Sequence, residues 1–143
     1  MKMIIDNFFL EVSQMNLKKL KKIFAEYNKI KAAYLFGSCA TGKQNRNSDL
    51  DIGILLAEDY DEMIKLDILT KLTKSNFDNV DLVIINNVSI LVKYEVIKHN
   101  QLIYCKEDFD SSAYFSKIIR LFLDFKPYLE VQRMYLKERI INC

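Results

Sequence analysis

Two aspartates separated by a single residue, Asp49 and Asp51, open a segment in which apolar and polar residues alternate. Side chains two positions apart on a strand point to the same side of a sheet, so both carboxylates are expected on one face. Carboxylates this close repel each other unless a cation lies between them. Oxygen ligands select a hard cation, and Mg²⁺ held by carboxylates keeps coordination positions for substrate phosphates. The pair therefore predicts a magnesium site.

Glycine is rare in this chain and is concentrated beside the two aspartates. The three glycines lie within seventeen consecutive positions, at Gly37, Gly42 and Gly53. Glycine is needed where the backbone takes a positive φ or approaches a ligand closely. Gly37 and Ser38 follow an apolar segment, and a turn of this kind offers backbone N–H groups and a hydroxyl to a phosphate. The sequence thus places a candidate phosphate-binding turn just before the metal site.

A third carboxylate, Asp81, interrupts the otherwise apolar segment 80–85. A buried charge without a partner is costly, so something must compensate it. If this segment forms a strand beside Asp49 and Asp51, the same metal ions provide the compensation, and Asp81 can accept the proton of an attacking hydroxyl. The alternative is that Asp81 lies at an exposed strand end and only terminates the strand.

Two other Asp-x-Asp patterns show that the spacing alone proves little. They are Asp59-Tyr60-Asp61 and Asp108-Phe109-Asp110. Both lie where helices are expected to begin, and acidic residues are favoured there by the helix dipole. Neither follows a Gly-Ser turn.

The elements that must position these residues follow from hydrophobic periodicity and from turn residues. Strands are expected at 31–36, 49–56, 80–85 and 102–105. The segment 49–56 is expected to bury one face. Helices are expected at 17–27, 59–74, 89–98 and beyond 108. For the last helix we expect Ser111 or Ser112 as the N-cap and a kink or break at Pro127, which leaves a final helix at about 128–140.

Length and composition fit one domain that mixes helices and strands. The chain has 143 residues, 21 basic and 19 acidic side chains, and a net charge of +2, without a clustered basic face that would indicate direct nucleic-acid binding. Cys39, Cys105 and Cys143 are too few and too widely spaced for a disulfide framework or a zinc site. Without a signal peptide or an apolar run of about 20 residues, we expect a cytoplasmic protein that does not bind membranes.

The arrangement of Gly37-Ser38, ten residues, Asp49-x-Asp51 and a later Asp81 resembles the DNA polymerase β-type nucleotidyltransferase superfamily, in particular its minimal members. The helical tail carries Asp124-Phe125-Lys126-Pro127, which resembles the antitoxin members of this family that pair with HEPN toxins. The motif covers positions 35–81, and the tail is similar more loosely.

The resemblance implies an α+β fold with a mixed sheet of three or four strands, flanked by helices and followed by a C-terminal helical tail. Residues 1–108 would form the nucleotidyltransferase core, and 109–143 an extension packed on it. ATP would be the substrate and two Mg²⁺ ions the cofactor. Asp49, Asp51 and Asp81 would bind the metals and carry the catalysis, and Gly37 and Ser38 would bind the triphosphate. A tyrosine of a HEPN toxin would accept AMP, and the two proteins would form a hetero-oligomer.

One departure from the family pattern concerns the basic residues that often follow Gly-Ser. Here Cys39 and Thr41 occupy those positions. Lys43 and Arg46 either supply the positive charge for the phosphates instead or are solvated loop residues.

Two other functions remain open. The tail is apolar on more than one face, so either a partner protein or the segment after Pro127 is expected to cover it, and an antitoxin that acts by binding alone is possible. Transfer of a nucleotide to a small molecule such as an aminoglycoside is the other alternative, but 143 residues leave little room for a substrate domain. His99, the single histidine, is expected to be structural at a helix end.

Overall fold

The structure, a computed structural model, describes residues 16–37 and 50–141, with side chains described up to residue 137. A helix covers residues 16–25. The elements that follow are β1 (Ile30–Phe36), β2 (Leu50–Leu56), α2 (Ile64–Lys74), β3 (Val80–Ile84), a 3₁₀ turn (Ile85–Asn87), α3 (Ile90–Ile97), β4 (Leu102–Cys105) and α4 (Ser111–Ile141). The expected order of helices and strands is confirmed.

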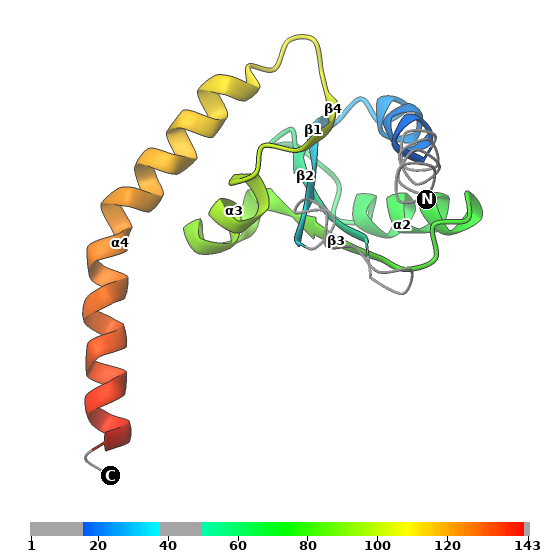
Figure 1. The fold of residues 1–143 in the computed structure, drawn as a ribbon. Helices are drawn as coiled ribbons and strands as arrows, with labels where there is room; N and C mark the ends of the chain where they lie inside the picture. The colour runs from blue at the N-terminus through cyan, green and yellow to red at the C-terminus, as the bar shows by residue number, and fades with distance from the viewer. Residues whose placement is uncertain (1–15, 38–49, 142–143) are drawn as a thin grey trace, which may run out of the picture.

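Four strands form one mixed sheet in the order β3-β2-β1-β4 (Figure 1). β1 pairs antiparallel with both β2 and β4, whereas β2 and β3 are parallel. α2 connects the two parallel strands, as a crossover between parallel neighbours requires. The α+β class with a mixed sheet is therefore confirmed, with four strands rather than three.

Helices cover both faces of the sheet. Helix 16–25 and α2 lie on one face, and α3 and the first part of α4 lie on the other (Figure 1). The core of the first face consists of aliphatic and aromatic side chains: Leu20, Ile23, Phe24, Ile30, Ala33, Ile52, Ile54, Leu56, Ile68, Leu72, Leu82 and Ile103. The second face buries Ala32, Tyr34, Leu55, Ile85, Val96, Ile97 and Ile118. β2 is thus buried on both faces from Ile52 onward, not on one face as expected.

Two helix starts differ from the sequence prediction. α2 begins at Ile64 rather than near Asp59, because residues 59–63 form turns in which the Asp61 carboxylate accepts a hydrogen bond from the Met63 N–H at 3.0 Å. The cap of α4 is Asp110, whose Oδ1 accepts from the Ala113 N–H at 3.0 Å, rather than Ser111 or Ser112. In both places a carboxylate, not a hydroxyl, satisfies an amide near the helix start.

The start of α3 is capped by a serine and is tied to β2. Ser89 Oγ accepts from the Val92 N–H at 3.4 Å. Just before it, the Asn86 side chain bonds both backbone groups of Leu56, accepting from its N–H at 2.9 Å and donating to its carbonyl at 2.7 Å. This amide therefore continues the hydrogen bonding of β2 where the strand ends.

α4 is a single helix that runs through Pro127, so of the expected kink or break the break is wrong, whereas the helix does bend between its first and second parts (Figure 1). The ring removes one backbone donor, but the helix continues on the far side. The first turns pack on the core through Tyr114, Phe115, Ile118 and Ile119, and Phe122 stacks on Tyr94 of α3 with ring centroids 3.7 Å apart.

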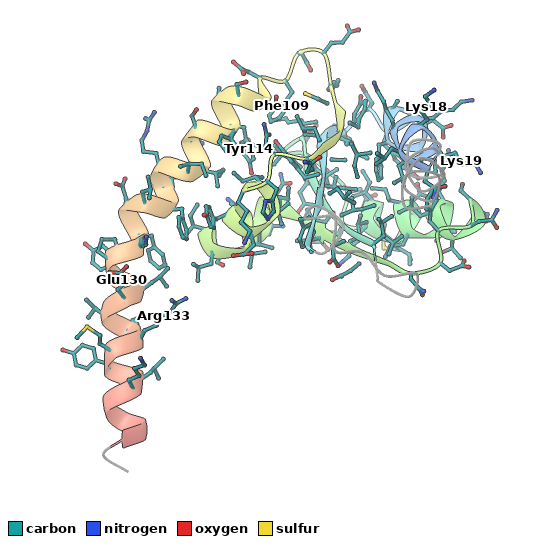
Figure 2. The ribbon with its side chains drawn as sticks, in the orientation of Figure 1. Lys18, Lys19, Phe109, Tyr114, Glu130 and Arg133 are labelled. Carbon is teal, nitrogen blue, oxygen red and sulfur yellow. The ribbon has the colours of Figure 1, made fainter. Side chains whose placement is uncertain are left out.

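The second half of α4 extends away from the sheet and does not fold back over the first half (Figure 1). Figure 2 places Glu130 and Arg133 on this extended part, and Phe109 and Tyr114 where the helix meets the core. Several large apolar side chains are exposed along it: Leu121, Leu123, Phe125, Tyr128, Val131, Met134, Tyr135 and Leu136. The tail thus packs on the core by its first turns, and its end is uncovered.

Among residues 16–37 and 50–141, none of the helices is both long and apolar enough to cross a bilayer.

Candidate functional site

Gly37, Asp51 and Asp81 meet at one end of the sheet, where β1 ends and β2 and β3 begin. In the antiparallel ladder Phe36 is opposite Asp51, so Gly37 follows directly beside it. In the parallel ladder Asp51 is the partner of Asp81. Neighbouring strands lie about 4.8 Å apart, so the two carboxylates start from adjacent backbone positions. The expectation that the Asp81 strand lies beside the Asp51 strand is confirmed.

Asp51 and Asp81 also share one face of the sheet. Along β2, Ile52 and Ile54 point into the core beneath helix 16–25 and α2, whereas Leu55 packs on the opposite side. Asp51 therefore lies on the side that α3 and α4 cover, because strand residues alternate. Its parallel partner Asp81 points the same way. The site thus opens at the sheet edge on the face of α3.

Gly37 allows the Asp51 carboxylate to approach the end of β1. Its φ is +68°, in the left-handed region that favours glycine. A Cβ built on Gly37 would lie 2.3 Å from Asp51 Oδ2, closer than any real contact. The backbone conformation therefore favours glycine, and any side chain at this position would have to displace the Asp51 carboxylate.

Asp81 is exposed, so the argument from a buried charge is wrong. It is the second residue of β3, at the strand end, where its carboxylate is accessible to solvent. The alternative of an exposed strand end describes its burial correctly. Its place in the site rests instead on its register with Asp51.

The donors at this sheet edge suit a hard divalent cation. Carboxylate oxygens on one face, next to a glycine turn, are the ligands that Mg²⁺ takes while it keeps sites for phosphates. Asp51 and Asp81 would hold the ion, together with Asp49 from the segment before β2. Within the described part of the chain no group of three His, Cys, Asp or Glu side chains is placed to bind a metal. Asp49 lies outside that part, as do Ser38, Lys43 and Arg46, so their assignments stay predictions.

The other Asp-x-Asp pairs have structural roles, as their positions at helix starts indicated. Asp59 forms an ion pair with Lys29 at 2.6 Å, and this hydrogen bond lowers the pKa of the Asp59 carboxyl. Asp61 caps the turn before α2, and Asp110 caps α4.

Gly53 has a packing role that the sequence did not indicate. A Cβ at this position would lie 2.3 Å from Val96 Cγ1, and Ile85 is also close. The missing side chain lets α3 pack directly on β2, two residues from Asp51. Clustering of glycines in the sequence suggested a ligand role for all three, but only a contact between distant elements explains Gly53.

Comparisons with known proteins agree with this geometry. A family model described as polymerase beta, nucleotidyltransferase, matches residues 18–109. The protein adenylyltransferase MntA of Shewanella oneidensis is 31% identical over 65% of this chain and 68% of its own length. The protein adenylyltransferase MntA of Aphanizomenon flos-aquae is 34% identical over 66% of this chain and 67% of its own.

Solved structures with the same fold come from toxin–antitoxin complexes. A chain from a toxin–antitoxin crystal structure with AMP-PNP has a TM-score of 0.68 and 26% identity, and the match covers 88% of this chain and 98% of that one. A chain from the complex of tri-AMPylated Shewanella oneidensis HEPN toxin with MNT antitoxin has a TM-score of 0.65 at 22% identity, covering 90% and 98%. This second likeness speaks for the fold alone.

Proposed function

The chain belongs to the polymerase beta nucleotidyltransferase family, and from this membership we propose that it is a Mg²⁺-dependent antitoxin that transfers AMP from ATP to a tyrosine of a HEPN toxin. The names of its relatives support the class of reaction. The match to a toxin–antitoxin complex with AMP-PNP supports ATP as donor and a toxin as hetero-oligomeric partner. The absence of a spanning helix among the described residues is compatible with the expected cytoplasmic location.

The carboxylates at the sheet edge organise the reaction. Asp49, Asp51 and Asp81 would hold Mg²⁺, and Gly37 and Ser38 would donate to the triphosphate, with Lys43 and Arg46 as candidate sources of positive charge. Bound Mg²⁺ stabilises the negative charge on the phosphate oxygens during an in-line displacement. The phenolic oxygen of the acceptor bonds to the α-phosphorus, the bond to the β-phosphate oxygen breaks, and pyrophosphate leaves. In this proposal Asp81, whose carboxylate is exposed, accepts the phenolic proton.

One observation carries this proposal: the contact of Gly37 with Asp51, and the register of Asp51 with Asp81, on one face of the sheet. Gly37 lies against the carboxylate of Asp51, and Asp81 lies on the adjacent strand. A turn suited to phosphate is therefore next to carboxylates suited to a cation. A packing role alone explains neither the exposed Asp81 nor the positive φ of Gly37 beside it.

The test is to incubate the protein with the product of the adjacent gene, Mg²⁺ and ATP labelled at the α-phosphate. We expect label on a toxin tyrosine. The double variant Asp49→Asn with Asp51→Asn should abolish labelling, whereas Asp59→Asn with Asp61→Asn, which removes the same two charges from an ion pair and a turn cap, should not. Labelling by the first double variant at the wild-type rate would refute the catalytic assignment.

A second candidate function, neutralisation by docking alone, is favoured by the exposed apolar end of α4. Apolar patches of this kind on one segment mark surfaces for protein partners. In that case the double variant at Asp49 and Asp51 would protect cells from the toxin as well as the wild type does. Protection lost together with labelling would exclude it.

A further inference from the structure

The turn between α3 and β4 lies near the candidate site. α3 covers the face of the sheet that carries Asp51, and its residue Val96 lies directly over Gly53, two positions along β2. The helix ends at Ile97, and β4 begins at Leu102. The intervening turn therefore starts above the same face as the carboxylates.

Backbone hydrogen bonds fix this turn beside the end of β1. The Leu35 N–H donates to the Gln101 carbonyl at 2.8 Å, only two residues before Gly37. The Asn100 N–H donates to the Ile97 carbonyl at 2.8 Å, and Asn100 has a φ of +50°. The turn is thus a tight left-handed termination of α3, held at the level of Gly37.

The polar groups of this turn are available to a ligand. His99 and Asn100 are exposed. Lys98, by contrast, is engaged with Glu95 at 2.8 Å and lies 6.0 Å from the centroid of the Tyr94 ring, on the side of α4. The turn therefore carries an exposed imidazole and an exposed amide, while its lysine is already paired.

The polar groups of the turn suit the nucleoside part of a nucleotide better than its phosphates. The C-terminal end of a helix carries free carbonyl groups and partial negative charge, which disfavours phosphate. A nucleoside instead presents both hydrogen-bond donors and acceptors. The side-chain amide of an asparagine can pair with either, because it has a donor and an acceptor. The triphosphate has its own partners at Gly37 and the metal-binding carboxylates.

From this geometry we infer that the turn 98–101 binds the nucleoside of the donor nucleotide, and that His99 and Asn100 determine which base is accepted. The inference rests on the proposed nucleotidyltransfer and adds a specificity site to it. The reaction at the α-phosphate is unchanged by this assignment, because the turn contacts only the ribose and base.

The structure offers a matched pair of variants to test this. Asn100 and Asn76 both have a positive φ, +50° and +71°, just after a helix, but Asn76 follows α2 on the opposite face of the sheet. Glycine adopts this conformation freely, so Asn100→Gly and Asn76→Gly both remove an amide without straining the turn. His99→Ala is the third variant.

Binding is measured by calorimetry with AMP-PNP and with GMP-PNP in the presence of Mg²⁺, on the full chain. We expect Asn100→Gly and His99→Ala each to raise the dissociation constant for AMP-PNP about 3- to 10-fold, the effect of one lost hydrogen bond, and to reduce the preference between the two nucleotides. Asn76→Gly should bind as the wild type does.

The outcomes separate this inference from the proposed function. If the wild type binds AMP-PNP and the Asn100 and His99 variants bind it equally well with the same base preference, the turn is not the nucleoside site, and the proposed function stands. If the wild type binds neither nucleotide, both fail.

Discussion

At the scale of single residues, the site depends on one glycine. Gly37 combines a positive φ with a contact that leaves no room for a Cβ beside Asp51. The sequence singled this residue out correctly, because glycine followed by serine after an apolar strand indicates a turn. What the sequence could not show is that the group pressed against Gly37 is a carboxylate of the site itself.

Gly37→Ala is expected to reduce AMP transfer at least about 100-fold, because the new methyl group displaces the Asp51 carboxylate, and small displacements of catalytic groups have effects of this size. The left-handed conformation should also cost about 1–2 kcal/mol in unfolding free energy. Labelling of the toxin and urea denaturation measure the two effects. Asn76→Ala provides the control, since it also places an alanine at a left-handed position, on the other face of the sheet. Equal losses of activity in both variants would contradict the prediction.

Two buried tyrosine hydroxyls, of Tyr34 and Tyr114, have no hydrogen-bond partner among the described residues. Their rings lie 6.5 Å apart, where α4 meets the sheet. Burial raises the pKa of Tyr114 to about 12 and raises that of Tyr34 as well, so both stay protonated at neutral pH. Each hydroxyl loses its hydration on folding and gains little in return.

Tyr34→Phe is therefore expected to raise the unfolding free energy by about 1 kcal/mol, since it removes a desolvated hydroxyl and keeps the ring. Urea denaturation at pH 7 measures the change. Tyr60→Phe is the matched substitution: its hydroxyl accepts a hydrogen bond from Asn87, and its removal should lower stability or leave it unchanged. A loss of stability in Tyr34→Phe would mean that its hydroxyl is hydrogen-bonded after all.

At the scale of elements, periodicity predicted the strands and most helices to within a few residues, and the errors have local causes. Asp59 and Asp61 are acidic residues of the kind favoured at helix starts, which is why a helix is expected there. The Asp61 carboxylate instead accepts a hydrogen bond within a turn, and α2 begins after it. Pro127 does not end α4, although a proline inside a helix costs about 3 kcal/mol. The helix continues on both sides of the proline. The pairing of strands that are distant in sequence, such as β1 with β4, could not be predicted, because no local sequence pattern indicates which strands pair.

The Asn86 amide joins the end of β2 to the start of α3, and α3 in turn covers the site. Asn86→Ala is expected to lower the unfolding free energy by about 2 kcal/mol, because two partly buried hydrogen bonds to Leu56 are lost together. Asn87→Ala, which removes one exposed contact with Tyr60, should cost less than about 1 kcal/mol. Thermal and urea denaturation of both variants measure the difference, and equal effects would show that the Leu56 bonds contribute nothing.

At the scale of the whole molecule, catalysis and docking are assigned to separate parts. The carboxylates lie at the sheet edge, and the uncovered apolar side chains lie beyond the first turns of α4. The sequence identified both features but left open whether the tail folds back on itself. That question depends on whether Pro127 breaks the helix or only bends it, which helix propensity alone does not determine.

Deletion of residues 128–143 is expected to abolish stable binding of the toxin and to leave the melting temperature of the core within a few degrees, because the described side chains removed are mostly exposed. Co-purification with the toxin and thermal denaturation measure the two effects. A charge-neutral surface variant with the full tail, Glu130→Gln with Arg133→Gln, should keep binding if apolar contacts dominate. A large drop in melting temperature on deletion would show that the tail stabilises the core instead.

The length of α4 also sets a constraint on any partner that binds its end. Residues 128–141 continue as helix, and at 1.5 Å per residue this arm reaches roughly 20 Å beyond Pro127. A partner that binds this part of α4 and also places a hydroxyl at Asp81 must be at least that long. A small molecule is too short to do both, so an acceptor that is recognised through this arm would have to be a macromolecule.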